Sequence, residues 1–442
     1  MLNAQTIPQR QYADLLKQRG MRYTDSGPWL TVGKADPRNK WVLFLPVKVL
    51  QTFELLQTVL PVLIEKKIPC RIIRNQAEHF KLNGGNYGHG EIGKAITLFP
   101  ATDQQAKEIV SILLPLTDTF KGVAIANSIR LGKIIYTARE VPSNSCPFTI
   151  PKQYRNKKRQ RIIGRWYVPI SSLKLSPKGD IYKCIHLLKL KWCIVKQGKA
   201  NIAEDSSGRD IKDRIIWEQS VLKNLPAHIP TPKIIDYFTK GEDCYLVMEY
   251  FEGIPLSNKI QSLLLQKPWK QIAITVQKEI LSYYLQAVQI IMQLHASGYV
   301  HRDINDNNFI ILPGNKVAII DLEIAYCLSS KQPDPPFYHG YPNYVAPEQL
   351  QYSIPTVHED TYSMGMLLVY MMTGTILTDC KDRIRTKTKL QSLTNDPVLT
   401  DLIVRCLNVL PQQRPSLHEV YNIITAHIEI LDIYNTQYKK AI

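Results

Sequence analysis

Three polar residues between positions 301 and 321 have the types and spacing that phosphoryl transfer requires. Asp303 lies in the run H-R-D-I-N-D-N-N, Asn308 follows it by five residues, and Asp321 ends the apolar strand pattern that comes next. One carboxylate must accept the proton of an attacking hydroxyl, while an amide oxygen and a second carboxylate can hold Mg²⁺ on the phosphates of ATP. We therefore predict Asp303 as the base and Asn308 and Asp321 as metal ligands.

The order of these residues, with further motifs downstream, resembles the catalytic region of protein kinases. Ala346–Glu348 (A-P-E) matches the end of an activation segment, and Arg414 in Q-R-P is expected to form a salt bridge with its glutamate. Asp360 in E-D-T-Y-S-M-G resembles the buried helix aspartate that braces the catalytic loop. Residues 167–425 thus resemble the eukaryotic-type Ser/Thr protein kinase superfamily, whose members use ATP and Mg²⁺.

This resemblance implies further residues that hold ATP. Lys196, at the end of C-I-V-K, matches the catalytic lysine that contacts the α- and β-phosphates, and Glu218 in I-I-W-E-Q is its expected helical partner. The loop over the phosphates keeps only the third glycine of its family pattern. Its matching residues, with a lysine that could supply charge instead, are Lys174, Ser176, Lys178, Gly179 and Ile181. Met248 is expected to border the adenine pocket, and Glu249 and Phe251 to read the adenine edge through their backbone.

The kinase pattern is altered at three positions. Asn305 stands where Ser/Thr kinases carry a lysine, Tyr341 stands in place of the threonine of G-T-P, and Glu323 replaces the glycine of D-F-G. Because that threonine helps to select Ser or Thr acceptors, these changes bear on acceptor choice and regulation. The residues expected to handle phosphate and metal are unaffected.

In finer detail the sequence is similar to the lyase and kinase portion of class III and class IV lanthionine synthetases. The resemblance rests on G-R-D-I-K-D-R-I-I-W-E, D-L-E and G-Y-P-N-Y-V-A-P-E-Q, and on Leu82–Pro100 (L-N-G-G-N-Y-G-H-G-E-I-G-K-A-I-T-L-F-P). In that family the kinase phosphorylates Ser or Thr of a ribosomal precursor peptide, and the lyase eliminates the phosphate to give dehydroamino acids. A zinc cyclase can follow, and we expect it to be absent here because no cysteine and histidine set remains for it.

One strand of the lyase-like region lacks the chemical groups that the family carries there. The family pattern W-K-x-H supplies a lysine and a histidine, and the matching residues here are Val42 and Phe44. Neither side chain can take an α-proton or support a departing phosphate. The polar residues that remain as candidates are Arg71, Tyr87, His89, Lys94 and Arg139. We therefore expect a lyase-derived domain with weak activity or none.

The elements that position these groups predict an α+β chain in several parts. We expect a small α+β domain over 1–140, a basic linker over 141–166, a kinase N-lobe over 167–250 and a kinase C-lobe over 251–442. In the first part, apolar patterns predict strands at Trp41–Val47, Cys70–Ile73 and Ala95–Phe99, a helix over Leu50–Leu63 broken or kinked at Pro61, and a helix capped by Asp103.

The kinase part reads as strands followed by helices. The patterns predict strands at Leu173–Tyr182, Lys189–Gln197 and Asp243–Tyr250, a helix over Ser207–Leu225, and a long amphipathic helix that Gly298 ends directly before the catalytic loop. Together these features predict a two-lobed protein-kinase-like fold preceded by a lyase-like domain.

Composition restricts where this chain works and what it binds. Its 442 residues carry a net charge of +17, with a dense basic run over Lys152–Arg165 that would suit an acidic leader peptide or a solvated linker. No base-reading motif accompanies the charge, so nucleic acid is not expected. Eight scattered cysteines without C-x-x-C pairs, no signal peptide and no membrane span indicate a reducing cytoplasm.

We therefore predict an ATP- and Mg²⁺-dependent Ser/Thr kinase that phosphorylates a ribosomal precursor peptide or protein, with a separate lyase or cyclase as a further partner. Four alternatives stay open: a bifunctional kinase and phospho-Ser/Thr lyase, a generic Ser/Thr protein kinase, a small-molecule phosphotransferase with H-x-D and I-D-x-E motifs, and a pseudokinase scaffold. Ala346–Glu348, Asp360 and Arg414 favour the protein kinase arrangement over the small-molecule one.

Overall fold

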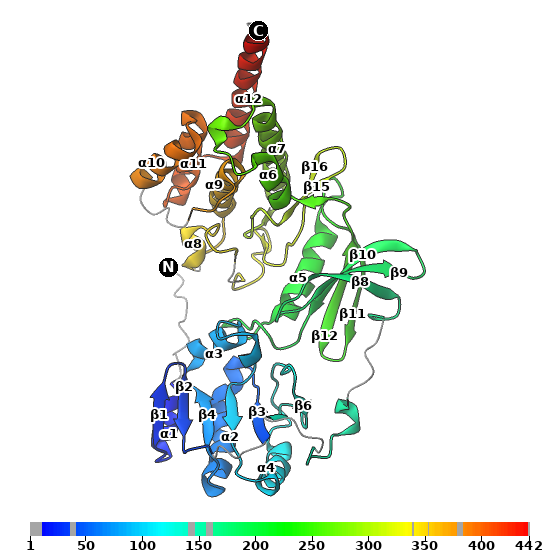
Figure 1. The fold of residues 1–442 in the computed structure, drawn as a ribbon, viewed down its shortest axis with the longest axis vertical. Coiled ribbons are helices and arrows are strands. Elements are labelled where there is room, and N and C mark those ends of the chain that lie inside the picture. The colour runs from blue at the N-terminus through cyan, green and yellow to red at the C-terminus, as the bar shows by residue number, and fades with distance from the viewer. Residues whose placement is uncertain are drawn as a thin grey trace. The chain divides into compact units, whose positions relative to one another are not determined.

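The computed structural model describes residues 11–35, 41–139, 146–155, 162–337, 340–351, 353–377 and 383–440. The chain divides into two compact units, Met1–Ile215 with Asp236–Val247, and Ile216–Ile235 with Met248–Ile442. Sheets dominate the first unit and helices the second, so the predicted α+β class is confirmed (Figure 1). The predicted domain boundaries at residues 140, 166 and 250 stay predictions.

The N-terminal part of the first unit is built on a seven-stranded sheet in the order β1-β2-β4-β5-β3-β7-β6, with every neighbouring pair antiparallel. Its strands are β1 (Tyr23–Ser26), β2 (Trp29–Val32), β3 (Trp41–Leu45), β4 (Cys70–Ile73), β5 (Ile96–Leu98), β6 (Ile129–Arg130) and β7 (Tyr136–Arg139). Its helices are α1 (Tyr12–Gln18), α2 (Thr52–Glu65), α3 (Gln76–Asn83) and α4 (Asp103–Leu116), with short 3₁₀ turns at Val49–Gln51 and His89–Glu91. The three strands predicted in this region are confirmed.

Two predictions about helices in this part need correction. The helix α2 continues through Pro61, so the predicted break is wrong, while a kink there stays a prediction. Leu60 and Leu63 on either side of Pro61 are buried in the same apolar core, which holds the helix together. Pro61 itself is exposed, so the carbonyl that loses its helical hydrogen bond lies near solvent. At α4 the capping residue is Thr102, whose Oγ1 accepts the Gln105 N–H at 3.1 Å, rather than Asp103.

A second sheet of five strands has the order β11-β12-β10-β9-β8. Its strands are β8 (Tyr167–Lys174), β9 (Ile181–His186), β10 (Lys191–Gly198), β11 (Ile234–Lys240) and β12 (Asp243–Glu249), and the helix α5 (Ile211–Asn224) lies between β10 and β11 in sequence. The predicted strand Leu173–Tyr182 is wrong, since Pro177 and Gly179 lie in a turn that separates β8 from β9. The predicted helix start at Ser207 is also wrong, because Asp205–Gly208 forms a turn closed by the Gly208 N–H on the Asp205 carbonyl.

The loop before α5 contacts the N-terminal sheet domain within the first unit. Glu204 is buried, and its Oε2 accepts the Val49 N–H at 2.7 Å, while the Lys48 Nζ donates to the Gly208 carbonyl at 2.8 Å. Asn201 adds a third contact through its Nδ2, which donates to the Gly122 carbonyl at 3.2 Å. Burial raises the pKa of Glu204 to about 6, against the attraction of Lys48. The start of α5 is therefore fixed partly by residues of the N-terminal domain.

The second unit is mainly helical around the buried helix α9 (Val357–Thr373). Its other helices are α6 (Leu256–Leu264), α7 (Ile274–Ala296), α8 (Pro347–Leu350), α10 (Arg383–Thr394), α11 (Pro397–Cys406) and α12 (Leu417–Lys440). Short strands form two small sheets, β13 (Ile254–Pro255) with β15 (Phe309–Leu312) and β16 (Lys316–Ile319), and β14 (Tyr299–Val300) with β17 (Tyr326–Cys327). The predicted long helix before the catalytic loop is α7, and it is followed by Gly298 at φ +83°.

Among the helices of the described residues, none has the length and apolar character that a bilayer crossing needs. The basic run Lys152–Arg165 lies partly outside the described residues, because positions 156–161 are not described. The short 3₁₀ turn Lys152–Tyr154 is the described element at its start.

One buried polar group in the N-terminal domain predicts a response to acid. His79 is fully buried, its Nδ1 lies 2.9 Å from the Thr52 Oγ1, and its Nε2 lies 3.2 Å from the Asn83 Nδ2. Burial lowers the pKa of His79 from 6.5 to about 3. Between these values the unfolded chain binds a proton that the folded chain does not, so this group makes stability fall as pH falls.

Below pH 6.5, we expect His79 to lower the free energy of unfolding of the wild-type chain by about 1.4 kcal/mol for each pH unit. The variant His79→Gln should lack this contribution. Urea unfolding followed by tryptophan fluorescence at several pH values measures it. The exposed His89 provides a control, since His89→Gln should keep the wild-type slope. Parallel pH curves for the wild type and His79→Gln would contradict this account.

Candidate active site

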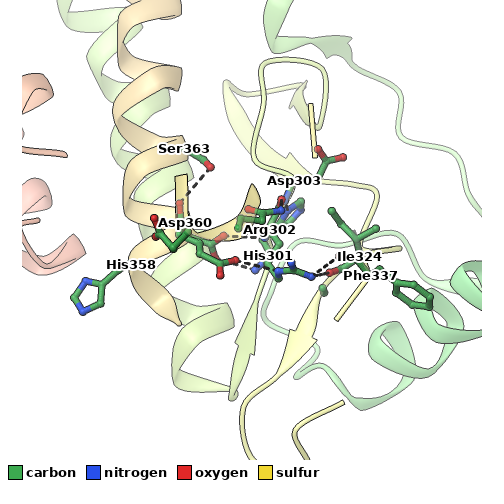
Figure 2. A network of polar contacts seen from close by, with 12 residues as sticks. His301, Arg302, Asp303, Ile324, Phe337, His358, Asp360 and Ser363 are labelled. Carbon is green, nitrogen blue, oxygen red and sulfur yellow. Dashed lines mark hydrogen bonds and ion pairs between the residues drawn. The ribbon is translucent and has the colours of Figure 1, made fainter. Parts of the chain in front are cut away.

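The catalytic loop predicted from H-R-D lies between β14 and β15 and is held by the carboxylate of Asp360 on α9. Its Oδ2 accepts the His301 N–H at 2.8 Å and its Oδ1 accepts the Arg302 N–H at 2.8 Å (Figure 2). Asp360 is fully buried, and His295 lies 2.8 Å from the same Oδ2. Although burial acts to raise the pKa of Asp360, the hydrogen bond from His295 helps to lower it, so the group stays ionised. The predicted bracing role of Asp360 is confirmed.

Asp303, the predicted base, is held on both carboxylate oxygens. Its Oδ1 accepts the Tyr341 N–H at 2.8 Å, and its Oδ2 accepts from the Asn308 Nδ2 at 3.2 Å. The backbone carbonyl of Asp303 accepts from the same Nδ2 at 2.8 Å and from the Asn305 Nδ2 at 3.0 Å. Asn305 therefore stiffens the loop by hydrogen bonds, and it brings no positive charge to the place where a lysine was expected.

The surroundings of Asp303 suit a group that accepts a proton near neutral pH. Burial, and next the negative charge of Asp321, raise the pKa of Asp303 to about 7. The Tyr341 N–H opposes this rise. A general base works best when its pKa lies near the operating pH. A cation beside Asp321 would offset part of the repulsion and shift the pKa of Asp303 downward.

Carboxylates from two segments meet next to the catalytic loop. Oxygen atoms of Glu218 on α5 and of Asp321 and Glu323 after β16 all lie within 4.8 Å of one another. Such a set of hard oxygen donors is what Mg²⁺ takes in proteins, so these residues fit a divalent cation. Asn308 directs its Nδ2 to Asp303, which leaves its Oδ1 as the amide atom with the chemistry of a cation ligand.

The sequence predicted Asp321 and Asn308 for this purpose but missed the meeting of Glu218 with Glu323. It follows from contacts between α5 and the start of the activation segment. The Leu322 N–H donates to the Glu218 Oε1 at 3.2 Å, and the Trp217 Nε1 donates to the Ala325 carbonyl at 2.6 Å. The signal available in the sequence was an acid two residues after Asp321, in place of the glycine of D-F-G.

Lys196 is buried on β10 and Glu218 is buried on α5. These two residues belong to different compact units of the chain. Their predicted pairing therefore stays a prediction.

The predicted phosphate-covering loop is the turn between β8 and β9. Steric contact explains why the one glycine that it keeps, Gly179, must be a glycine. Gly179 has φ +153°, and a Cβ at this position would lie 1.8 Å from the Gln197 carbonyl oxygen. The Ser176 Oγ donates to the Gly179 carbonyl at 2.7 Å, and Lys178 accepts from the Lys199 N–H at 2.9 Å. Ile181 begins β9 directly after this turn. Ser176, Lys178 and Gly179 thus form one tight turn against β10, while Lys174 ends β8 before the turn. The contact of the five predicted loop residues with phosphates stays a prediction.

Two of the predicted adenine-reading residues, Met248 and Glu249, end β12, and Phe251 follows the strand; all three belong to the second unit. Met248 is buried, Glu249 is exposed and Phe251 is half-buried. The Glu249 N–H is already engaged, since it donates to the Lys233 carbonyl at 2.9 Å. Any contact of Glu249 with adenine would therefore use its carbonyl group, and the adenine role of these three residues stays a prediction.

The end of the activation segment is fixed to the helical core as predicted. The Arg414 Nη2 donates to the Glu348 Oε2 at 2.9 Å, and the Arg414 Nη1 donates to the His358 carbonyl at 2.8 Å. The Arg414 side chain is fully buried. The predicted Glu348–Arg414 salt bridge is confirmed.

The lyase-like face of the N-terminal sheet is apolar at the two altered positions. Val42 and Phe44 are buried on β3 and cluster with Ile125 and Tyr136. Two of the candidate cations are paired with one acid, since the Arg71 Nη2 lies 2.9 Å and the Lys94 Nζ 3.2 Å from the Glu91 carboxylate. His89, another candidate among the described residues, is exposed. Arg139 lies on β7, and its side chain is outside the described residues.

Known families match both parts of this chain. Residues 177–423, more than half of the chain, match the model of the protein kinase domain. The chain belongs to the protein kinase family. Residues 9–137 of this kinase match the model named RamC, N-terminal domain. The predicted recognition is confirmed, because the first model covers the predicted kinase region and the second covers the region predicted to be lyase-like. Protein kinases in general use ATP with a divalent metal ion.

Individual relatives agree with these families. The Probable SapB synthase of Streptomyces coelicolor is 22% identical over 355 residues, which cover 70% of this chain and 38% of that protein. The serine/threonine-protein kinase PrkC of Bacillus subtilis is 31% identical over 153 residues, covering 33% of this chain and 22% of the relative. The serine/threonine-protein kinase C of Synechocystis is 27% identical over 197 residues. The chain thus spans well under half the length of these relatives. The predicted Ser/Thr protein kinase class agrees with the names of the second and third.

The Gly179 geometry leads to a test of the loop in this kinase. Gly179→Ala should weaken ATP binding by about tenfold or more, because the added Cβ collides with the Gln197 carbonyl and must displace the turn. Gly241→Ala is a matched control, since Gly241 also has a positive φ but nothing lies within 4 Å of its Cβ position. Titration with a fluorescent ATP analogue measures both. Equal affinities in the two variants would show that the turn does not contact the nucleotide.

Proposed function

We propose that this kinase transfers the γ-phosphate of ATP to Ser or Thr of a ribosomally made precursor peptide, in a lanthipeptide-like biosynthetic route. The observation that carries the proposal is the presence in one chain of a protein kinase domain and a RamC N-terminal domain, with Asp303 next to a group of carboxylates. The similarity to a protein named SapB synthase supports a role in biosynthesis.

Each predicted residue has a defined part in this proposal. Asp303 accepts the proton of the peptide hydroxyl, held ready by the Tyr341 N–H and the Asn308 amide. Asn308 and Asp321 would hold Mg²⁺, which when bound supplies positive charge to the phosphates. Lys196, positioned by Glu218, would orient the α- and β-phosphates. The remaining ATP contacts come from Ser176, Lys178, Gly179, Ile181, Met248, Glu249 and Phe251.

The partners belong to the same proposal. The basic run Lys152–Arg165 would attract an acidic leader of the peptide. A separate lyase, and a cyclase after it, would act on the phosphorylated product. We place this work in the cytoplasm, where ATP and newly made peptide are available together.

The role of Asp303 is tested by Asp303→Asn. This variant should bind Mg²⁺-ATP nearly normally and lose phosphate transfer by about 10²- to 10⁴-fold, because an amide cannot accept the hydroxyl proton. Asp321→Asn should instead weaken the dependence on Mg²⁺. Glu279→Gln is a matched control on α7, where Glu279 pairs with Lys259 at 2.8 Å and neither residue is among the predicted site residues. Near-normal turnover in Asp303→Asn would remove Asp303 from the mechanism.

The second test asks what the chain makes by itself. The strand positions Val42 and Phe44 cannot transfer a proton, while the kinase residues are all present, so phosphorylation should run well ahead of elimination. With ATP, Mg²⁺ and a Ser/Thr/Cys-rich precursor peptide, mass spectrometry should show phosphate gain with little loss of water. Efficient loss of water would instead support a bifunctional enzyme, and Lys94→Ala and His89→Ala would then locate the groups responsible.

A further inference from the structure

Arg302, between His301 and Asp303, has its guanidinium buried and in use. Only 3% of the residue is exposed. Its Nε donates to the Glu359 Oε2 at 3.0 Å. Its Nη1 donates to the Phe337 carbonyl at 2.9 Å and to the Ile324 carbonyl at 3.4 Å (Figure 2). Ile324 and Phe337 belong to the activation segment between Asp321 and Glu348, so one side chain joins the catalytic loop to two points of this segment.

The charge that balances Arg302 comes from the helical core. Glu359 lies in the first turn of α9, is completely buried, and immediately precedes the bracing residue Asp360. Among the described residues its Oε1 has no hydrogen-bond partner, so the hydrogen bond of Oε2 with Arg302 is its main polar contact. Burying an arginine is costly unless its charge is paired. Glu359 therefore makes the buried position of Arg302 stable.

In many kinases an activation segment becomes ordered when it is phosphorylated, because the phosphate pairs with arginine. Here the Glu359 carboxylate already pairs with Arg302, the arginine of the catalytic loop. The same segment is also fixed at Tyr341, whose N–H donates to Asp303, and next to its end at Gln349, whose Nε2 donates to the Arg302 carbonyl at 3.0 Å.

We propose that Glu359 is a positioning residue that supplies from α9 the negative charge that a phosphate supplies in other kinases, so that the activation segment is held for catalysis without phosphorylation. The inference rests on the proposed kinase function. It also agrees with the sequence, since Ser329 and Ser330 are the only Ser or Thr residues between positions 322 and 348.

The first experiment uses the unaltered full-length chain. The protein is treated with a phosphatase that removes phosphate from Ser, Thr and Tyr, its intact mass is checked, and the phosphatase is removed. The initial rate of phosphate transfer to casein should equal that of untreated protein and show no lag. The variant Ser329→Ala/Ser330→Ala should behave in the same way. A lag, or a rate lost on dephosphorylation or in this variant, would overturn the inference.

The second experiment tests the residue itself, above neutral pH, because burial raises the pKa of Glu359 to about 7. In Glu359→Gln the value of kcat should fall about tenfold or more with a smaller change in KM for ATP. Glu359→Asp keeps the charge and should recover part of the rate, and Glu279→Gln should match the wild type. Hydrogen exchange of residues 322–337 should rise in Glu359→Gln only. Wild-type kcat and unchanged exchange in Glu359→Gln would overturn the role.

The two experiments separate this inference from the proposed function. The phosphatase experiment needs no substitution, so it decides the question even if Glu359→Gln does not fold. A wild-type chain that is active only while phosphorylated overturns the inference and leaves the kinase function standing. A chain that transfers phosphate to neither casein nor a precursor peptide in either state overturns the proposed function, and the inference with it.

Discussion

The carboxylate of Asp360 is the contact on which the candidate site depends. Its two oxygens hold successive backbone N–H groups, those of His301 and Arg302, at a point where Arg302 has the unfavourable φ of +68°. A non-glycine residue keeps such a conformation only when its surroundings impose it. Because α9 is buried from Glu359 to Met372, Asp360 can act as a rigid anchor, and the direction of Asp303 follows from it.

The carboxylates around this anchor have different tasks because they have different neighbours. Asp360 has histidine and backbone donors and remains charged. Asp303 is partly buried and lies near the negative charge of Asp321, and both effects raise its pKa, so it is a better proton acceptor. Glu359 faces a guanidinium and serves to hold the activation segment. The same functional group thus serves as anchor and counter-charge within one small region, and in Asp303 it has the surroundings that a base requires.

The sequence was a good guide where a single pattern determines the structure. Apolar runs located the strands of the N-terminal sheet, and Glu348 with Arg414 could be paired because both belong to motifs of one family. It failed where a turn interrupts an apolar run, as at Gly179, which was placed inside a strand. It also missed the meeting of Glu218 with Glu323, because that depends on how α5 packs against a segment about a hundred residues away.

The contact of Glu204 with Val49 and Lys48 has a consequence for how this chain can be divided. A fragment that starts after the N-terminal domain would leave an acid adapted to burial without the backbone N–H and the ammonium group that satisfy it. The loop that leads into α5, and with it the helix carrying Glu218, would lose a support. An N-terminal domain that had lost its own catalytic activity would then still be retained in evolution, because the kinase part depends on it for structural support.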